Sequence, residues 1–312
     1  MMELKKLLNI KYSVIMAPMF LVTNLKMMME ADKCGISGCI PALNFRNISD
    51  FKNALKELKE KCHHAFGVNV IVNKSNFFLK EQMKWILEYQ VPYITTSLGS
   101  PKNIILECKK NKILVFSDVV DEIHAKKVQD LGGDALIAVN NQAGGHLGQY
   151  SARELILKLK NVVRIPIISA GGVATKAGFD EIMSLGADGI CVGSPFIACT
   201  ESDVSTSYKN ACVNFGAKDI VVTNKISGTP CTVIKTPYVE KIGTQQNCVE
   251  AFLNSNKRLK KIAKFFITYK GFSLLKKAAF GANYKQVWVA GKSIEYVDKI
   301  RPLREIVERL TK

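Results

Sequence analysis

Short apolar runs rich in β-branched residues recur along the first two-thirds of the chain. Most of these runs are continuous rather than alternating, which is typical of parallel strands whose two faces are both buried. They predict strands over Tyr12–Met19, Ser37–Ala42, Ala65–Val72, Tyr93–Leu98, Ile113–Val119, Ala135–Asn140, Pro166–Gly171 and Gly189–Ser194. We therefore expect a parallel sheet in this part of the chain.

The segments between these runs have the apolar spacing of helices. They predict helices over Phe51–Lys61, Asn76–Tyr89, Pro101–Leu106, Asp121–Leu131, Arg153–Leu159 and Thr175–Leu185. Eight strands that alternate with helices are typical of a (β/α)8 TIM barrel, and a doubly wound open sheet is the alternative. No G-x-G-x-x-G motif follows any strand, so the α/β fold that we predict is the TIM barrel.

The alternation breaks from about Ile226 to Tyr284, where the sequence is basic, has helical spacing and is poor in strand signals. We interpret this stretch as a small, mostly helical basic subdomain that is inserted near the carboxyl terminus. The chain then divides into a barrel domain (1–225), the basic subdomain (226–286) and a C-terminal segment that returns to the barrel as a helix (287–312).

The chain is strongly basic, with a net charge of +17 and a pI of about 9.4. No acidic residue lies between Glu250 and Glu295. This excess of basic residues has two explanations: a basic face that is simply solvated, or a surface that attracts an acidic carrier protein or a phosphate-bearing substrate. No nucleic-acid motif is present, so we expect no nucleic acid partner. A hydrophobic content of 47% and a charged content of 23% are those of an ordinary globular enzyme.

The nine cysteines are irregularly spaced and include no C-x-x-C pair. This argues against a disulfide framework, a structural zinc site and an iron–sulfur cluster. No apolar run reaches the roughly 18 residues that span a bilayer. Pro18 interrupts the apolar stretch near the amino terminus, and no signal-peptide cleavage site follows it. We expect a cytoplasmic protein with no metal and no membrane association.

In a TIM barrel the chemistry lies at the carboxyl ends of the strands. Gly171 and Gly172 follow the seventh predicted strand, and Gly193 and Ser194 follow the eighth. Loops at these two places form the recurrent phosphate cradle of the fold. Glycine lets backbone N–H groups approach phosphate oxygens closely, and Ser194 adds a hydroxyl donor. The sequence therefore predicts a site for a phosphate-bearing ligand.

His146 lies in the stretch "NNQAGGHLGQY", directly after the sixth predicted strand. The glycines around it leave room for a flat ligand beside the phosphate cradle. Because an imidazole titrates near neutrality, we predict that His146 is catalytic. His63, His64 and His124 lie in or beside predicted helices, and we expect them at the surface.

Other strand ends supply further candidates. Ala17, Pro18 and Met19 end the first strand and bring backbone groups to the barrel mouth. Asn69 lies within the apolar third strand, where its amide must be satisfied by the protein or by a ligand. Ser117, near the end of the fifth strand, is a weaker candidate of the same kind.

Several segments resemble the nitronate monooxygenase (2-nitropropane dioxygenase) family, which also contains FMN-dependent enoyl-acyl-carrier-protein reductases. They are "IMAPM", "FGVNV", "QAGGHLG", "IPIISAGGVATKAG", "LGADGICVGSPFIACTES" and "SGTP", in this order. The resemblance covers about residues 10–235 and a C-terminal "VWVAGKS" segment. It implies a TIM barrel that binds FMN non-covalently.

The resemblance also implies roles for individual positions. His146 matches the histidine over the active site. The cofactor-binding positions that it implies, together with the strand-end candidates above, are Ala17, Pro18, Met19, Asn69, Ser117, Gln142, Gly144, Gly145, Ala170, Gly171, Gly172, Gly193 and Ser194. Phe20, Leu21 and Val22 depart from the family, because many members have small residues after the first-strand methionine.

Three functions follow from the resemblance. The first expectation is a nitronate monooxygenase, an oxidoreductase in which the flavin oxidises a nitronate and is reoxidised by O₂. The second is an NAD(P)H-dependent reductase of enoyl thioesters, which the basic region would suit if the substrate is carried by an acidic protein. The third is an FMN-binding barrel without catalysis, although His146 argues against it. The sequence leaves the substrate, the choice of NADH or NADPH and a homodimer open.

Overall fold

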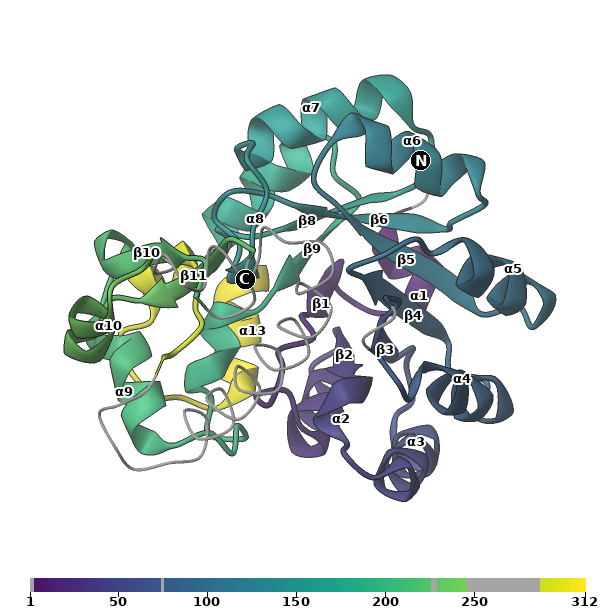
Figure 1. Ribbon diagram of the computed structural model, residues 1–312, viewed down its shortest axis with the longest axis horizontal. Coiled ribbons are helices and arrows are strands. Elements are labelled where there is room, and N and C mark those ends of the chain that lie inside the picture. Colours follow the sequence, from purple (N-terminus) through teal and green to yellow (C-terminus); the bar gives the residue numbers. More distant parts are fainter. Residues whose placement is uncertain (1–2, 74–75, 226–228, 246–286) are drawn as a thin grey trace, which may run out of the picture.

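A closed barrel of eight parallel strands forms the main body of the computed structural model, which describes residues 3–73, 76–225, 229–245 and 287–312 (Figure 1). The strands are β1 (Val14–Met16), β2 (Ser37–Pro41), β3 (Gly67–Ile71), β4 (Tyr93–Ser97), β5 (Leu114–Val119), β6 (Ala135–Val139), β8 (Ile167–Ala170) and β9 (Gly189–Val192). They follow one another around the barrel in chain order, and β1 closes it by pairing with β9. The predicted TIM barrel and its eight strands are confirmed.

Helices connect successive strands on the outside of the barrel. They are α2 (Leu25–Lys33), α3 (Ile48–Lys61), α4 (Leu79–Glu88), α5 (Lys102–Lys110), α6 (Glu122–Asp130), α7 (Ala152–Val162) and α8 (Lys176–Ser184). Side chains cap several of their amino termini: Asp121 accepts from the His124 N–H, and Ser151 forms a capping box with Glu154. Such caps satisfy backbone donors that the first helical turn leaves open.

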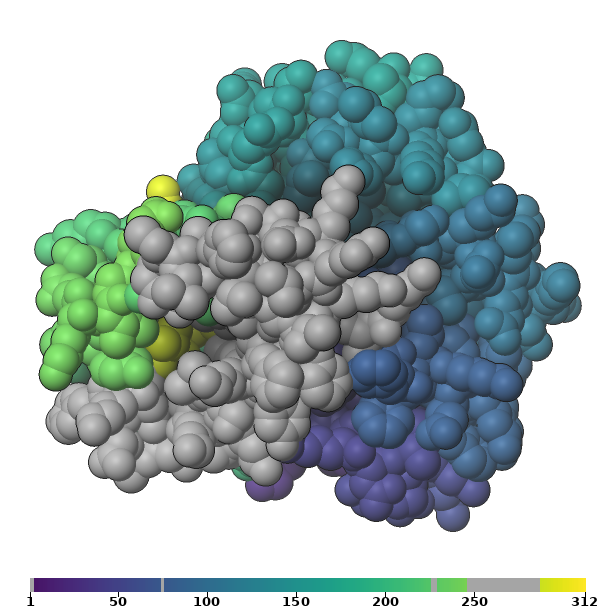
Figure 2. Space-filling view, viewed as in Figure 1, coloured from purple at the N-terminus to yellow at the C-terminus, as the bar shows by residue number. Residues whose placement is uncertain are grey.

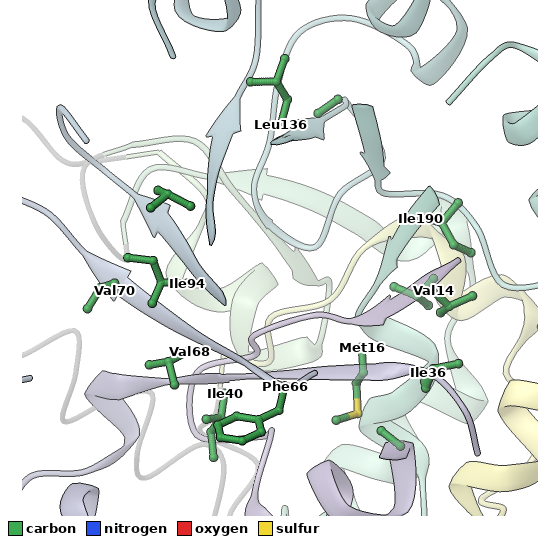
Figure 3. Packing of buried hydrophobic residues seen from close by; sticks show 14 of the residues in the cluster. Val14, Met16, Ile36, Ile40, Phe66, Val68, Val70, Ile94, Leu136 and Ile190 are labelled. Carbon is green, nitrogen blue, oxygen red and sulfur yellow. The ribbon is translucent and has the colours of Figure 1, made fainter. Parts of the chain in front are cut away.

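Successive strand residues alternate between two apolar layers. Outward residues such as Val68, Val70 and Ile94 pack beneath the helices in the larger cluster (Figure 3). Inward residues fill the barrel, where the rings of Tyr93 and Phe116 stack with centroids 4.8 Å apart. The barrel is therefore a packed core rather than a pore, and a ligand at the mouth can reach only the inward residues near the carboxyl ends of the strands.

Helix α1 (Leu4–Leu8) covers the amino-terminal end of the barrel. The Leu4 N–H donates to the Asp188 carbonyl at 3.0 Å, and the Leu4 side chain is fully buried among the inward residues. This leaves the carboxyl ends of the strands as the open mouth.

A second sheet of three antiparallel strands lies beside the mouth, in the order β10 (Ile220–Thr223), β11 (Cys231–Ile234) and β7 (Gly145–His146). The connecting elements are η1 (Ala42–Asn44), η2 (Ser194–Ala198), α9 (Thr206–Asn214), η3 (Ala217–Asp219) and α10 (Pro237–Ile242). In the space-filling view, the green residues of this region and the yellow C-terminal residues lie together at one edge of the molecule (Figure 2).

Strand β11 corrects one expectation, because the 226–286 stretch was predicted to lack strands. Strand β11 is as long as β8 and β9, but it lies outside the alternation of strands and helices that identified them, and it pairs with β10 and β7 in a separate sheet. Helix α10 fits the helical expectation. Residues 246–286 lie outside the described residues, so the division of the chain into three parts stays a prediction.

The C-terminal segment contains η4 (Lys292–Tyr296) and α13 (Leu303–Thr311). Helix α13 packs against α8 and α2 and buries Leu303, Val307 and Leu310. Ahead of it, Trp288 stacks on Tyr208 with ring centroids 5.7 Å apart. This contact belongs to a second apolar cluster beneath the three-stranded sheet. The C-terminal segment thereby joins the barrel to that sheet.

Candidate active site

The loop after β8 follows a path that only glycine allows. Gly171 and Gly172 have φ values of +116° and +85°, which L side chains rarely adopt. A Cβ atom on Gly171 would lie 2.4 Å from the Asn140 Oδ1, and one on Gly172 would lie 2.1 Å from the Gln142 Oε1. The loop therefore presents bare backbone at the mouth, next to Ala170 at the end of β8.

Several backbone N–H groups lie close together at this part of the mouth. Within the part of the chain that the structure describes, the N–H groups of Gly171, Gly172 and Ser194 have no recorded acceptor. The Ser194 hydroxyl accepts from the Gly291 N–H at 2.8 Å, and its own proton remains available for donation. Gly193 lies beside the Met19 sulfur, 3.5 Å from the position of a Cβ. These groups fit an anionic oxygen-bearing ligand such as a phosphate.

Asn140 joins the loop after β6 to the loop after β8. Its Nδ2 donates to the Gly171 carbonyl at 3.0 Å, and its Oδ1 accepts from the Gln142 N–H at 2.8 Å. The side chain is completely buried, so both bonds replace lost contacts with water. The sequence analysis did not single out Asn140, although a polar residue at the end of an apolar strand is a usable signal.

His146 lies on β7 and is held by the neighbouring strand β11. His146 pairs with Cys231 across the ladder, and its Nε2 lies 2.9 Å from the Thr229 Oγ1. The Thr232 hydroxyl donates to the Ala143 carbonyl at 3.0 Å and braces the same loop. Part of the imidazole is open to solvent, yet the surrounding protein desolvates it enough to lower its pKa. A neutral imidazole can accept a proton.

The three-glycine loop also contacts the C-terminal segment. A Cβ on Gly144 would lie 2.9 Å from both the Gly291 N and the Ser194 Oγ. Gly145 has a φ of +79° and continues into β7. The glycines around His146 thus serve close backbone packing as well as open space. Thr229 was missed as a partner of His146, although "SGTP" was among the segments that carried the resemblance.

The loop after β1 is a compact turn. The Ala17 N–H donates to the Val192 carbonyl at 2.8 Å, and Thr23 bridges the turn by accepting from the Met19 N–H at 3.0 Å. Pro18 lies between them and is half-buried. Val22 is buried in the second apolar cluster rather than at the mouth. The apolar residues that depart from the family are therefore not all directed at the ligand.

The opposite side of the mouth is formed by side chains. The Asn69 amide on β3 donates to the Thr95 Oγ1 at 3.0 Å and to the Ser97 Oγ at 2.8 Å, both on β4. The Ser97 hydroxyl in turn donates to the Asp118 Oδ2 on β5 at 2.5 Å. Solvent reaches Asp118 from the mouth, but the surrounding protein raises its pKa to about 6. Asn69 thus belongs to a hydrogen-bond network that ends at the Asp118 carboxyl group.

Ser117 does not lie with Asn69, Ser97 and Asp118 at the mouth. It is buried on the outer face of β5, where its Oγ lies 2.7 Å from the Thr96 Oγ1. Neighbouring residues of a strand point to opposite faces, so the inward position belongs to Asp118. Of these two adjacent residues, the structure brings Asp118 and not Ser117 to the mouth. A charged residue inside the apolar run "ILVFSDV" was the missed signal.

The other histidines lie away from the mouth. His63 and His124 are exposed, as expected. His64 is half-buried, with its Nδ1 3.1 Å from the Asp32 Oδ1. Across the described residues, no group of three or more potential ligands could hold a metal ion, and no helix is long and apolar enough to cross a membrane.

The model of the nitronate monooxygenase family matches residues 36–312. The chain belongs to the nitronate monooxygenase family. It is an oxidoreductase of this family, whose members depend on a flavin.

Curated proteins and solved structures fit this assignment. The chain is 25% identical over 308 residues to a probable nitronate monooxygenase of Staphylococcus aureus, covering 84% of this chain and 86% of that one. It is also 25% identical to a Rhodococcus jostii hydroxy-methyl-oxo-octahydro-indene-carboxyl-CoA dehydrogenase, covering 81% and 72% of the two chains. The structure of FabK from Thermotoga maritima aligns with a TM-score of 0.85 and 28% identity, over 98% of this chain and 94% of that one.

Proposed function

We propose that this member of the nitronate monooxygenase family is an FMN-dependent enzyme of the cytoplasm that oxidises nitronates or nitroalkanes with O₂. The main support for the proposal is that two features occur together at the mouth of the barrel. Gly171 and Gly172 present backbone donors where a side chain would clash, and His146 lies on the adjoining loop.

The residues at the mouth fit FMN. The N–H groups of Gly171, Gly172 and Ser194 would hold its phosphate, because each lacks a recorded acceptor among the described residues. The turn of Ala17, Pro18 and Met19 and the Asn69 amide would lie along its ring system, and Gln142 and Gly144 would border it. Bound FMN would supply the electron transfer, which protein side chains alone do not provide.

His146 would act on the proton of the substrate. A neutral nitroalkane must lose a proton from carbon before it becomes a nitronate, and a neutral imidazole can accept that proton. The Thr229 hydroxyl beside Nε2 would fix the orientation of the ring. Desolvation lowers the pKa of His146, so the basic form predominates at neutral pH.

A second candidate is an NAD(P)H-dependent enoyl-thioester reductase. The likeness to FabK from Thermotoga maritima, at 28% identity over 98% of this chain, favours it. A relative named as a dehydrogenase of a CoA ester points to the same substrate class. In this reaction His146 would donate a proton to the substrate carbon instead of accepting one. The basic residues that would attract an acidic carrier lie between 246 and 286, outside the described residues, and a homodimer also stays a prediction.

Oxygen consumption separates the two candidates. We expect the purified, FMN-loaded enzyme to consume O₂ with propyl-2-nitronate and to leave enoyl thioesters unchanged when NADH or NADPH is added. Turnover of an enoyl thioester with either nucleotide, without O₂ consumption on the nitronate, would replace the first candidate by the second. A third result, stable FMN binding with no turnover of either substrate, would identify a binding protein.

A further inference from the structure

Asp118 occupies a part of the mouth that neither the phosphate site nor His146 uses. Around the closed barrel, β3 and β4 stand opposite β8 and β9, and β5 follows β4 (Figure 1). A ligand whose phosphate is held after β8 and β9 must extend its flat ring away from them, across the mouth. The ring would therefore approach the side chains of Asn69, Ser97 and Asp118.

These three side chains form a directed chain of hydrogen bonds. Asn69 donates to Ser97 at 2.8 Å, and Ser97 donates to Asp118 at 2.5 Å. The Ser97 hydroxyl thereby uses its proton on one oxygen of Asp118. Within the described residues, no further hydrogen bond to the Asp118 carboxyl is recorded, and no lysine or arginine forms an ion pair with it. Its other oxygen is left for a ligand.

Among the described residues, the titratable groups that face Asp118 do not compensate its charge. The Cys39 thiol on β2 and the Cys191 thiol on β9 have pKa values raised by burial, to about 12 for Cys39, and remain uncharged. Tyr93, deeper in the barrel, also has a raised pKa. His146 on the rim has a lowered pKa and is neutral near pH 7.

Apolar side chains complete the surroundings of Asp118. It pairs in register with Ile137 on β6, and Ala170 ends the next strand, β8. Although solvent reaches Asp118 from the mouth, the surrounding protein desolvates its carboxylate, and this desolvation raises the pKa of Asp118 to about 6. Near neutral pH this residue changes between a neutral hydrogen-bond donor and an anion.

We propose that Asp118 is a flavin-facing carboxyl group whose protonation state sets how strongly the mouth holds reduced FMN relative to oxidised FMN. The inference rests on the proposed binding of FMN. A flavin ring gains negative charge when it is reduced near neutral pH. Protonated Asp118 can donate a hydrogen bond to that ring, whereas ionised Asp118 repels it. The site therefore favours reduced flavin at low pH and opposes it at high pH.

The midpoint potential of the bound flavin tests this proposal. It is measured spectrophotometrically against a reference dye, from pH 5 to pH 8, in the FMN-loaded enzyme and in Asp118→Asn. At pH 8 we expect Asp118→Asn to favour reduced FMN about tenfold more than the parent does, which is about 30 mV for a two-electron couple. At pH 5 the two proteins should agree within twofold.

Two further variants make the result specific. Asp130→Asn removes a carboxyl from the exposed end of α6 and should follow the parent at every pH. Ser97→Ala removes the donor that stabilises the ionised form, so the pH at which the potential departs from that of Asp118→Asn should move upward. If Asp118→Asn does not fold, the pH dependence of the potential in Ser97→Ala is compared with that of the parent, and its change of slope should lie at a higher pH.

The outcomes separate this inference from the proposed function. An offset between Asp118→Asn and the parent that is constant with pH, or no offset at all, would overturn the role of Asp118 while FMN binding stands. An unchanged profile in Ser97→Ala would overturn it as well. If the parent protein binds no FMN, the proposed function fails and the inference fails with it.

Discussion

The two sides of the barrel mouth present different chemical groups. The glycine side consists of the loops after β6, β8 and β9, with Gly144, Gly171, Gly172 and Gly193. The network side consists of Asn69, Ser97 and Asp118 on β3, β4 and β5. Backbone donors on the glycine side carry no titratable charge. The network side ends at the Asp118 carboxyl group. We therefore expect the charge of the site to change with pH at Asp118 and at His146, while binding by the backbone donors of the glycine side does not depend on pH.

The largest effect should come from the glycine side. Gly171→Ala places a Cβ 2.4 Å from the Asn140 Oδ1 at a φ of +116°. Backbone strain of this kind costs about 1–3 kcal/mol, and the clash displaces the loop. We expect the variant to purify without FMN and with a lowered melting temperature.

Gly178→Ala is the matched control, because its Cβ would meet neighbours at 3.5 Å and 3.6 Å, in ordinary contact. It should retain FMN and melt at or above the temperature of the parent. Full FMN content in Gly171→Ala would contradict the role given to the glycine side.

His146 should give the next largest effect. We expect His146→Gln to keep FMN but to turn over a neutral nitroalkane about 10²–10⁴-fold more slowly, the usual contribution of a general base. The turnover of a preformed nitronate should fall less, because this substrate has already lost its proton. In the parent enzyme, nitroalkane turnover should fall as the pH drops and the imidazole gains a proton. Since burial lowers the pKa of His146, this fall should occur below the usual range for histidine.

His124→Gln changes an exposed histidine and should leave these rates unchanged. Equal losses on the nitroalkane and the nitronate in His146→Gln would argue against proton transfer and for a role in positioning.

Ser194 should have a moderate effect, on stability. Ser194→Ala leaves the buried Gly291 N–H without its acceptor, which costs about 1–3 kcal/mol. Denaturant unfolding should show this loss, and Ser184→Ala at an exposed helix end should show less than half of it. Unchanged stability in Ser194→Ala would mean that the C-terminal segment does not depend on this bond.

The smallest effect should come from Asp118 in the protein without FMN. The pKa of Asp118 is raised in the folded state, so folding becomes less favourable as the pH rises from about 4 to about 6 and Asp118 ionises. We expect Asp118→Asn to raise the melting temperature at pH 8 and to leave it nearly unchanged at pH 4. A larger gain at pH 4 than at pH 8 would contradict the assigned ionisation.

The two sides also differ in how well the sequence predicts them. Glycines at strand ends, such as Gly171 and Gly172, reflect requirements of the local backbone, so both the barrel and its glycine turns could be predicted. The network side depends on which residues of β5 point inward, and a shift of one residue exchanges Ser117 for Asp118. Sequence spacing alone did not resolve that choice.

Long-range pairing sets the second limit. Thr229 and strand β11 acquire their roles only by meeting His146 and β7, which lie more than eighty residues earlier in the chain. Strand β11 also lies outside the alternation of strands and helices that made the barrel strands predictable. The contact between Gly144 and Gly291 is of the same kind, because it joins two loops that no local pattern connects.

Anaerobic mixing tests the central claim most directly. Purified, yellow enzyme is mixed in turn with propyl-2-nitronate, NADH and NADPH while the visible flavin band is followed. For a nitronate monooxygenase we predict rapid bleaching by the nitronate, recovery of the band when O₂ is admitted, and no bleaching by either nucleotide. A colourless protein that cannot be loaded with FMN, or bleaching by a nucleotide and not by the nitronate, would contradict it.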